Sequence, residues 1–339
     1  MNKKVNRFAF LRSKKMAVMN LIQTINHTLD QQLAKNKNIV LLGEDVGKNG
    51  GVFRVTEGLW QKFGDDRVID TPLAEVGIIS VAFGMAVAGL RPVPEVQFDG
   101  FSIPMIDQIY NHVARIRKRS QGKYSSPLVL RIPHGGGIKA YEHHSESLET
   151  FFCHIPGIKV VTPSGPYNAK GLLVSALADP DPVIFLEPKR VYRAIKEEVP
   201  EKEYVISFPK TDIVQEGKDL TIIAWGAMQK IVREAVSEVN NKYSIEILDL
   251  LTLSPLDKKP IIESVKKTGR CIVVQEAPKT CGFGAELVAL IQKEAFLSLE
   301  APIERVTAPD IPMPLAKMEN YHIPDAPKII RAIEKVMNF

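Results

Sequence analysis

The sequence predicts an α/β protein with two domains, each built on a parallel β-sheet with helices on both faces. A length of 339 residues and a hydrophobic content of 45% are enough for about two packed cores. Short apolar segments alternate with helical patterns up to about residue 187, and the alternation resumes after about residue 218, which predicts β-α-β units in both halves. The charged, Pro-containing stretch between the halves predicts a surface linker.

The expected strands are short apolar runs, and the expected helices are the longer segments between them. In the first domain, placed at 16–200, strands are expected at 39–42, 68–69, 92–98, 128–132, 159–161 and 183–186, with helices at 76–88 and 168–177. In the second domain, placed at 201–339, strands are expected at 221–224, 244–248 and 271–275, with helices at 229–239 and 286–294.

The positive charge of the chain, +5, comes from its first residues. Positions 1–15 contain six Lys or Arg residues and no acid, whereas the remainder has 38 basic and 39 acidic residues. We expect 1–15 to be a disordered extension or translation upstream of a start at Met16 or Met19, because a transit peptide would be longer and richer in Ser. The body has no electrostatic footprint for nucleic acid.

The three cysteines are far apart and form no CxxC motif, which predicts a reducing compartment, the cytoplasm, and no zinc site. No run of 18 apolar residues is present, so no membrane span is expected.

The stretch from Arg67 to Asp107 contains the strongest candidate for a ligand site. Thr71 and Pro72 follow a predicted strand and are expected to cap and open a helix, which puts Glu75 near the helix N-terminus. In that position Glu75 can stabilise the helix dipole or, in an apolar setting, share a proton with a ligand nitrogen.

Two aromatic residues follow the next predicted strand, at the carboxyl end where α/β proteins bind ligands. In an extended chain Phe98 and Phe101 would point to opposite faces, but Gly100 between them permits a turn that re-aims Phe101. Both rings could equally belong to the core.

A glycine-rich segment and a histidine pair follow the strand at 128–132. His134 and the three glycines after it are similar to an anion-binding loop, although no Lys-Ser/Thr completes a P-loop. A histidine on such a loop, His143 or His144, can serve acid-base chemistry or can simply be solvated. A zinc site with Glu146 is not expected, because the spacing lacks the helical HExxH pattern.

Two other surfaces are left open between two interpretations. The helix at 76–88 has a flat face for core packing or for a subunit interface, formed by Gly77, Ser80, Gly84 and Ala88. A basic cluster on another helix is a solvated face or a docking site for an acidic partner, formed by Arg115, Arg117, Lys118 and Arg119.

The ordered motifs LLGEDVG, GGVFRVTEGL, DTPLAE, GLRPVPEVQF, GGGIKAYEHHSESLE, PGIKVVTPS and QEA resemble one family over nearly the whole chain from Met16. It is the family of beta subunits of the thiamine-diphosphate-dependent decarboxylase component of 2-oxo acid dehydrogenase complexes, within the transketolase-like superfamily. The GGVFR start, GGGI loop and KVMNF ending are most similar to its bacterial pyruvate dehydrogenase members. The resemblance implies a pyrimidine-binding domain followed by a transketolase C-terminal-like domain.

The resemblance also implies roles for individual residues. Glu75 matches the glutamate that hydrogen-bonds the aminopyrimidine ring and so promotes formation of the thiazolium ylide. Phe101 matches the aromatic residue that stacks on the pyrimidine, and Glu44 matches an acid near the cofactor. By register, His144 matches the loop histidine that acts on the substrate, with His143 as the alternative.

A structural potassium ion is implied by the same resemblance. Its oxygen ligands would come from Leu128, Ala176, Asp179 and Asp181, although related sequences often have Asn at the last position.

The diphosphate-binding half of the site is missing from the sequence. The superfamily binds magnesium and diphosphate with a GDG motif followed by Asn, and no GDG occurs here. The resemblance therefore implies an alpha subunit that binds magnesium and diphosphate in an alpha2-beta2 heterotetramer. It further implies that the second domain contacts the peripheral-subunit-binding domain of the dihydrolipoyl acetyltransferase core.

The function expected from this resemblance is oxidative decarboxylation of pyruvate and reductive acetylation of the lipoyl group. The alternatives are a branched-chain 2-oxo acid or acetoin dehydrogenase beta subunit, a self-sufficient transketolase-type homodimer, and a noncatalytic assembly subunit.

Overall fold

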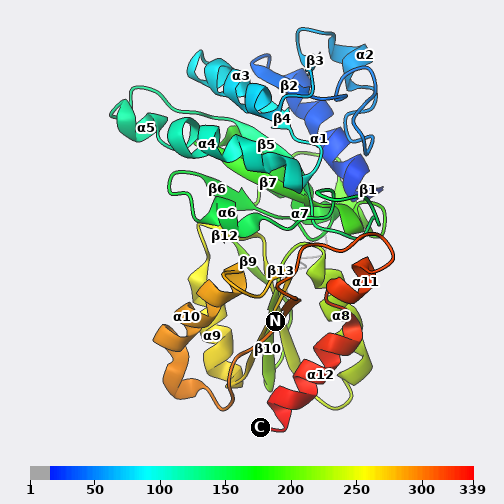
Figure 1. Cartoon of the computed structure of the whole chain (residues 1–339), viewed down its shortest axis with the longest axis vertical. Helices are drawn as coiled ribbons and strands as arrows, with labels where there is room; N and C mark the ends of the chain where they lie inside the picture. Colours follow the sequence, from blue (N-terminus) through cyan, green and yellow to red (C-terminus); the bar gives the residue numbers. More distant parts are fainter. Residues whose placement is uncertain (1–15) are drawn as a thin grey trace, which may run out of the picture.

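The computed structural model describes residues 16–339 and shows two α/β domains, one above the other in Figure 1. The first domain, blue to green, is built on a seven-stranded sheet, and the second, yellow-green to red, on a five-stranded sheet. The predicted fold class is therefore confirmed. The extension predicted at 1–15 lies outside the described residues.

The first sheet has the strand order β12-β6-β7-β5-β4-β2-β3, with β12 antiparallel to β6 and the other pairs parallel. Its central strands are buried on both faces and therefore consist of nearly continuous apolar runs. The strands are β2 (Ile39–Gly43), β3 (Val68–Asp70), β4 (Arg91–Glu95), β5 (Val129–His134), β6 (Lys159–Val161), β7 (Val183–Pro188) and β12 (Thr252–Ser254).

Helices cover both faces of this sheet. On one face α1 and α7 pack against each other, and on the other face α3 packs against η2 and α4. Helix α1 begins with a capping box, in which the Asn20 side chain accepts from the Gln23 amide and the Gln23 side chain accepts from the Asn20 amide. The helices are α1 (Leu21–Lys35), α2 (Leu59–Phe63), α3 (Glu75–Val87), η2 (Asp99–Met105), α4 (Ile106–Gln108), η3 (Ile109–Val113), α5 (Ile116–Arg119), α6 (Glu149–Cys153), α7 (Pro166–Ala178) and η4 (Lys189–Val191).

The second sheet has the order β14-β13-β10-β11-β9, with β9 antiparallel to β11 and the other pairs parallel. Figure 1 shows α9 and α10 on one side of it and α8 and α12 on the other. The elements are β9 (Thr211–Gln215), β10 (Leu220–Ala224), α8 (Met228–Val239), β11 (Ile245–Leu250), α9 (Lys258–Thr268), β13 (Cys271–Pro278), α10 (Phe283–Ala295), η5 (Phe296–Ser298), β14 (Glu304–Ala308), α11 (Glu319–His322) and α12 (Ala326–Met337).

The predicted linker at 188–218 is wrong in two places. Strand β8 (Lys196–Pro200) pairs antiparallel with β1 (Met16–Asn20), and β9 forms the edge of the second sheet. Burial of both strands is partial, with Val199 and Pro200 buried in β8 and only Thr211 buried in β9, so neither has the continuous apolar run of a central strand.

The two domains are joined by backbone pairing as well as by side chains. Strand β12 follows β11 in the chain but completes the sheet of the first domain by pairing with β6. At this junction the Ser164 hydroxyl, just before α7, donates to the buried carboxylate of Asp249 at the end of β11. Burial raises the pKa of Asp249 to about 7.

Replacing Asp249 with Asn should remove a pH dependence of stability. Because the folded state holds the Asp249 proton up to a pH of about 7 and the unfolded state releases it near 4, the free energy of unfolding falls as pH rises through this window. Relative to wild type, Asp249→Asn should gain at most about 1.4 kcal/mol per pH unit there. Urea unfolding at pH 4.5, 6 and 7.5 measures this, and a constant difference would contradict it.

Candidate active site

The predicted site residues lie at one edge of the first sheet. Glu44 follows β2, Glu75 follows β3, Phe101 lies in η2 after β4, and His144 lies in the loop after β5. These four strands are parallel neighbours in the order β5-β4-β2-β3, so their carboxyl ends meet at the same edge. Residues spread over a hundred positions of sequence are thereby brought to one edge.

Three rings form an aromatic cluster at this edge. The Phe98 and Phe101 ring centroids lie 5.6 Å apart in an edge-to-face arrangement, and the His144 ring lies 4.3 Å from Phe98 and 5.0 Å from Phe101. The turn that begins at Phe98 brings the two phenyl rings together, as the presence of Gly100 allowed. A side chain at 100 would collide with the carbonyl oxygen of His143, so glycine is required by close approach of the His144 loop.

The two histidines occupy different environments. His144 is half-buried against the phenyl rings, and its Nδ1 lies 2.8 Å from the Glu142 carbonyl oxygen. His143 is exposed and has a left-handed backbone with φ of 65°. Of the two histidines, His144 is therefore the one whose ring contacts Phe98 and Phe101.

Two carboxylates interact with each other at the same edge of the sheet. Glu44 and Glu75 are both half-buried. Partial burial, together with the negative charges of Asp45 and Glu75, raises the pKa of Glu44. Glu44 therefore retains its proton to a higher pH than an isolated glutamate does.

The expected cap of the helix that carries Glu75 is wrong. Helix α3 begins at Glu75 itself, its N-cap residue is Ala74, and the Thr71 hydroxyl has no hydrogen-bond partner among the described residues. Thr71 is held instead by its backbone, whose amide donates to the Gly43 carbonyl across the end of the sheet. Glu75 is nevertheless in the first turn, where a helix favours a negative charge.

A buried ion network lies in the strands below the site. Arg131 of β5 binds Glu187 of β7 through two nitrogens, at 2.6 and 3.0 Å, and Glu95 of β4 through a third, at 2.5 Å. The Tyr192 hydroxyl donates to Glu187 at 2.7 Å. All four side chains are buried, and the sequence alone offered no signal that they would meet.

A second buried network, which sequence reasoning missed, lies where the site borders the second domain. His134 Nδ1 is 2.7 Å from Asp99, and burial opposes a charge on His134, but Asp99 and Glu149 outweigh burial and raise its pKa. Burial lowers the pKa of Lys189 to about 8, and its ammonium lies 5.5 Å from the Phe98 ring centroid. These charged side chains contact both ends of the His144 loop, through Asp99 at Leu148 and Lys189 at Pro133.

The residues expected to bind potassium lie near one another, away from this edge. The Leu128 carbonyl accepts from the Val183 amide at 3.0 Å, and the Ala176 carbonyl accepts from the Asp179 amide at 3.2 Å. The Asp179 and Asp181 carboxylates are paired with the protein's own cations, Lys159 at 2.6 Å and Arg117 at 2.5 Å. Among residues 16–339, no group of three or more His, Cys, Asp or Glu side chains could hold a metal ion.

The two surfaces left open by the sequence differ in outcome. In the basic cluster, Arg117 pairs with Asp181, Arg115 lies over the Tyr110 ring at 4.2 Å, and Arg119 donates to the Asn111 carbonyl. These internal contacts favour the interpretation as a solvated face.

The small-residue face of α3 is mostly solvent-exposed, because Gly77, Gly84 and Ala88 are exposed. Leu73 and Val81 beside it are exposed by 70% and 52%, so packing within this chain does not explain the face. It remains available for a subunit interface.

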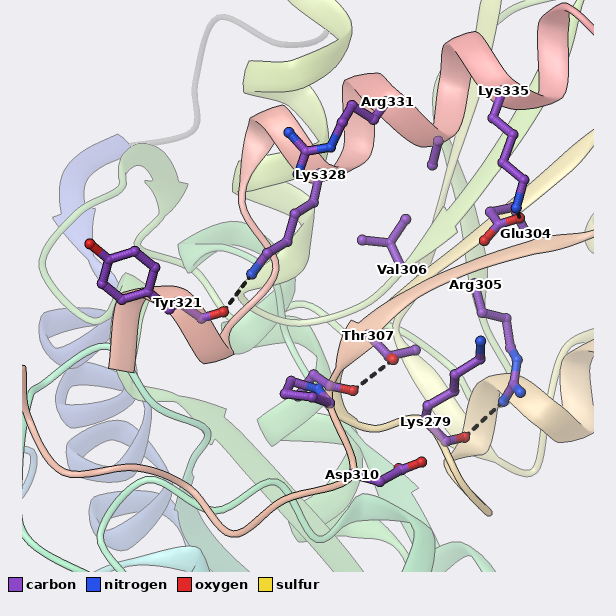
Figure 2. Close-up of a pocket in the computed structure, with 13 residues that line it drawn as sticks. Lys279, Glu304, Arg305, Val306, Thr307, Asp310, Tyr321, Lys328, Arg331 and Lys335 are labelled. Carbon is purple, nitrogen blue, oxygen red and sulfur yellow. Dashed lines mark hydrogen bonds and ion pairs between the residues drawn. The ribbon is translucent and has the colours of Figure 1, made fainter. Parts of the chain in front are cut away.

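An open surface pocket in the second domain is separate from the site. It has a volume of about 530 Å³ and is lined by residues of β14 and α12, and Figure 2 shows the side chains that line it. Lys335 pairs with Glu304 at 2.6 Å and Lys328 donates to the Tyr321 carbonyl at 2.8 Å. None of the predicted site residues lines this pocket.

No helix in the described part of the chain is both long and apolar enough to cross a membrane.

Comparisons with known proteins define the class. The family model "Transketolase, pyrimidine binding domain" matches residues 17–195, and "Transketolase, C-terminal domain" matches 209–329. A solved structure titled "Split gene transketolase, inactive beta4 tetramer" has the same fold, with a TM-score of 0.76 and 21% identity over 95% of this chain and 99% of its own. The domains are those of a transketolase-like protein, a class that uses thiamine diphosphate.

Curated relatives narrow the class to one family. The chain is 52% identical to the pyruvate dehydrogenase E1 component subunit beta of Acholeplasma laidlawii over 322 residues, which is 95% of this chain and 98% of the relative. It is 49% identical to the subunit of that name from Bacillus subtilis, over 96% of this chain and 100% of the relative, and 48% identical to that of Staphylococcus aureus over the same shares. The chain belongs to the family of pyruvate dehydrogenase E1 component beta subunits.

Proposed function

We propose that this chain is the beta subunit of a thiamine-diphosphate-dependent enzyme that decarboxylates pyruvate and transfers the acetyl group to a lipoyl group. The observation that carries the proposal is the convergence of Glu75, Phe101 and His144 at one sheet edge in a chain of this family. A scaffold subunit would not need this arrangement.

The side chains at the edge suit an aminopyrimidine ring. A half-buried phenyl ring at Phe101 offers a stacking surface, and the carboxylates of Glu75 and Glu44 offer proton-sharing groups for ring nitrogens. When bound, thiamine diphosphate supplies a carbon nucleophile for the 2-oxo group of the substrate. In this proposal Glu75 holds a proton at the pyrimidine nitrogen, Phe101 orients the ring, and His144 moves a proton at the substrate.

An alpha subunit is the proposed partner, because this chain lacks the GDG motif that binds magnesium and diphosphate. The exposed small-residue face of α3 supports an interface with a partner subunit, since small side chains let helices approach closely. We further propose that the second domain contacts the peripheral-subunit-binding domain of the acetyltransferase core and that the assembly works in the cytoplasm.

Potassium remains part of the proposal on the family resemblance. A carbonyl oxygen has two lone pairs, so Leu128 and Ala176 could still coordinate a cation while accepting their backbone hydrogen bonds.

Reconstitution tests the proposal. Decarboxylation of pyruvate that depends on magnesium and thiamine diphosphate should appear when the chain is co-expressed with its alpha subunit and should be absent from the chain alone. Preference for branched 2-oxo acids over pyruvate would indicate a branched-chain 2-oxo acid dehydrogenase beta subunit. Activity of the chain alone would favour a self-sufficient homodimer. Absence of activity towards all 2-oxo acids in a well-assembled mixture would favour a noncatalytic assembly subunit.

The two histidines should differ in the assembled enzyme. His144→Ala should lower kcat/KM for pyruvate by roughly 10²-fold or more, because acid-base groups contribute this much. His143→Ala should stay within about twofold, since its side chain is exposed and outside the aromatic cluster. Steady-state kinetics of both heterotetramers measures the difference, and the reverse ranking would show that His143 is the active residue.

A further inference from the structure

The backbone amides of the glycine-rich segment after β5 donate to carboxylates, and these carboxylates are side chains of the same chain. The Gly136 amide donates to the Glu276 carboxylate at the end of β13, and the Gly137 amide donates to the Glu319 carboxylate at the start of α11. The similarity of this segment to an anion-binding loop therefore has a structural basis, with two glutamates of the second domain in place of a phosphate.

The fit between these groups is close. Glu276 and Glu319 are 7% and 1% exposed. A Cβ atom on Gly136 would lie 2.7 Å from the Ile323 Cδ1 atom, 3.1 Å from the Glu319 carboxylate and 3.3 Å from that of Glu276, so a side chain at 136 would push these groups away from the backbone. Lys189, whose positive charge faces both glutamates, lies against the same segment and donates to the Pro133 carbonyl at 3.2 Å.

The far end of the loop is fixed by the first domain. The Leu148 amide donates to Asp99 at 2.8 Å, and the same carboxylate oxygen lies 2.7 Å from His134 Nδ1, directly before the glycines. His144 lies between these two anchors, with its ring against Phe98 and Phe101. Of these two anchors, the one at Gly136 and Gly137 is provided by the second domain.

We propose that Glu276, assisted by Glu319, is a positioning residue through which the second domain holds the His144 loop in its working place. Loss of the Glu276 carboxylate leaves a buried amide unpaired and frees one end of the loop. Glutamine at 276 retains an acceptor oxygen of similar reach. The catalytic consequence rests on the function proposed above, whereas the holding of the loop does not.

The test uses the assembled heterotetramer and two readouts. In Glu276→Ala, amide hydrogen exchange of peptides covering 135–148 should become about tenfold faster, because a hydrogen bond to a charged acceptor is lost. Turnover should fall by a similar factor while the Kd for thiamine diphosphate changes less than twofold. Glu276→Gln should restore both exchange and turnover to within about twofold of wild type.

The matched control is Glu263→Ala, a glutamate of the same domain that is 67% exposed on α9 and should change neither readout. Unchanged exchange of 135–148 in Glu276→Ala would overturn the proposal. If Glu276→Ala fails to assemble, Glu319→Ala tests the neighbouring anchor, and unchanged exchange there would overturn it as well. If the wild-type assembly does not act on pyruvate, the exchange measurement still decides whether the glutamates hold the loop.

Discussion

Replacing Glu75 with Ala should reduce turnover of the assembled enzyme by roughly 10²–10⁴-fold, the range that proton transfer by a placed side chain contributes. Glu75 is half-buried at the first position of α3, beside Glu44 and at the same sheet edge as the aromatic cluster. The variant should still form the heterotetramer, because α3 begins at a backbone position that needs no side-chain cap. Steady-state decarboxylation and size-exclusion chromatography together measure the two effects.

The control for this prediction is again Glu263→Ala, where the same substitution removes an exposed carboxylate. Its turnover should match that of wild type. If Glu75→Ala also retained full turnover in an intact tetramer, the catalytic role proposed for Glu75 would be wrong. That result would favour the alternative that the chain is a noncatalytic assembly subunit.

Replacing Arg131 with Met should lower the free energy of unfolding by about 3–5 kcal/mol, the cost of breaking a buried ion pair. The guanidinium is 1% exposed and pairs with two carboxylates that are 4% and 0% exposed. Burial of Glu95 already raises its pKa despite the presence of Arg131, and without the guanidinium both acids would have no compensating charge. Urea unfolding followed by circular dichroism measures the loss.

Two variants separate charge from packing. Lys259→Met removes an exposed cation on α9, 3.8 Å from Glu263, and should change stability by less than about 0.5 kcal/mol. Adding Glu95→Gln and Glu187→Gln to Arg131→Met should recover part of the loss, because neutral amides cost less to bury than carboxylates do. A stability of Arg131→Met within about 1 kcal/mol of wild type would show that the network contributes little.

The sequence predicted the fold class and the central strands of both sheets because their signals are local. Apolar runs such as 159–161 and 183–186 begin where β6 and β7 begin, and the helix at 229–239 corresponds to α8. The misplaced cap at Thr71 and the missed strands β8 and β9 show the limit, since edge strands are stabilised by pairing with distant segments. Propensity within a short window contains no information about such partners.

For the candidate site, too, some features could be predicted from the sequence and others could not. The order of the strands was enough to point to Glu75, the two Phe residues and the histidine pair, because each follows a strand whose parallel arrangement could be predicted. The resemblance to the family then selected Phe101 and His144. The tertiary structure alone decided that His144, and not His143, packs against Phe98.

The same holds for the contacts that join distant segments. The structure decided that the exposed face of α3 is not part of this chain's core and that Glu276 meets Gly136 across 140 residues of sequence. These outcomes depend on which strands are neighbours and which side chains fill the space between them. The sequence by itself determined local conformation and the residue types available for chemistry, whereas packing in three dimensions determined which of those residues meet.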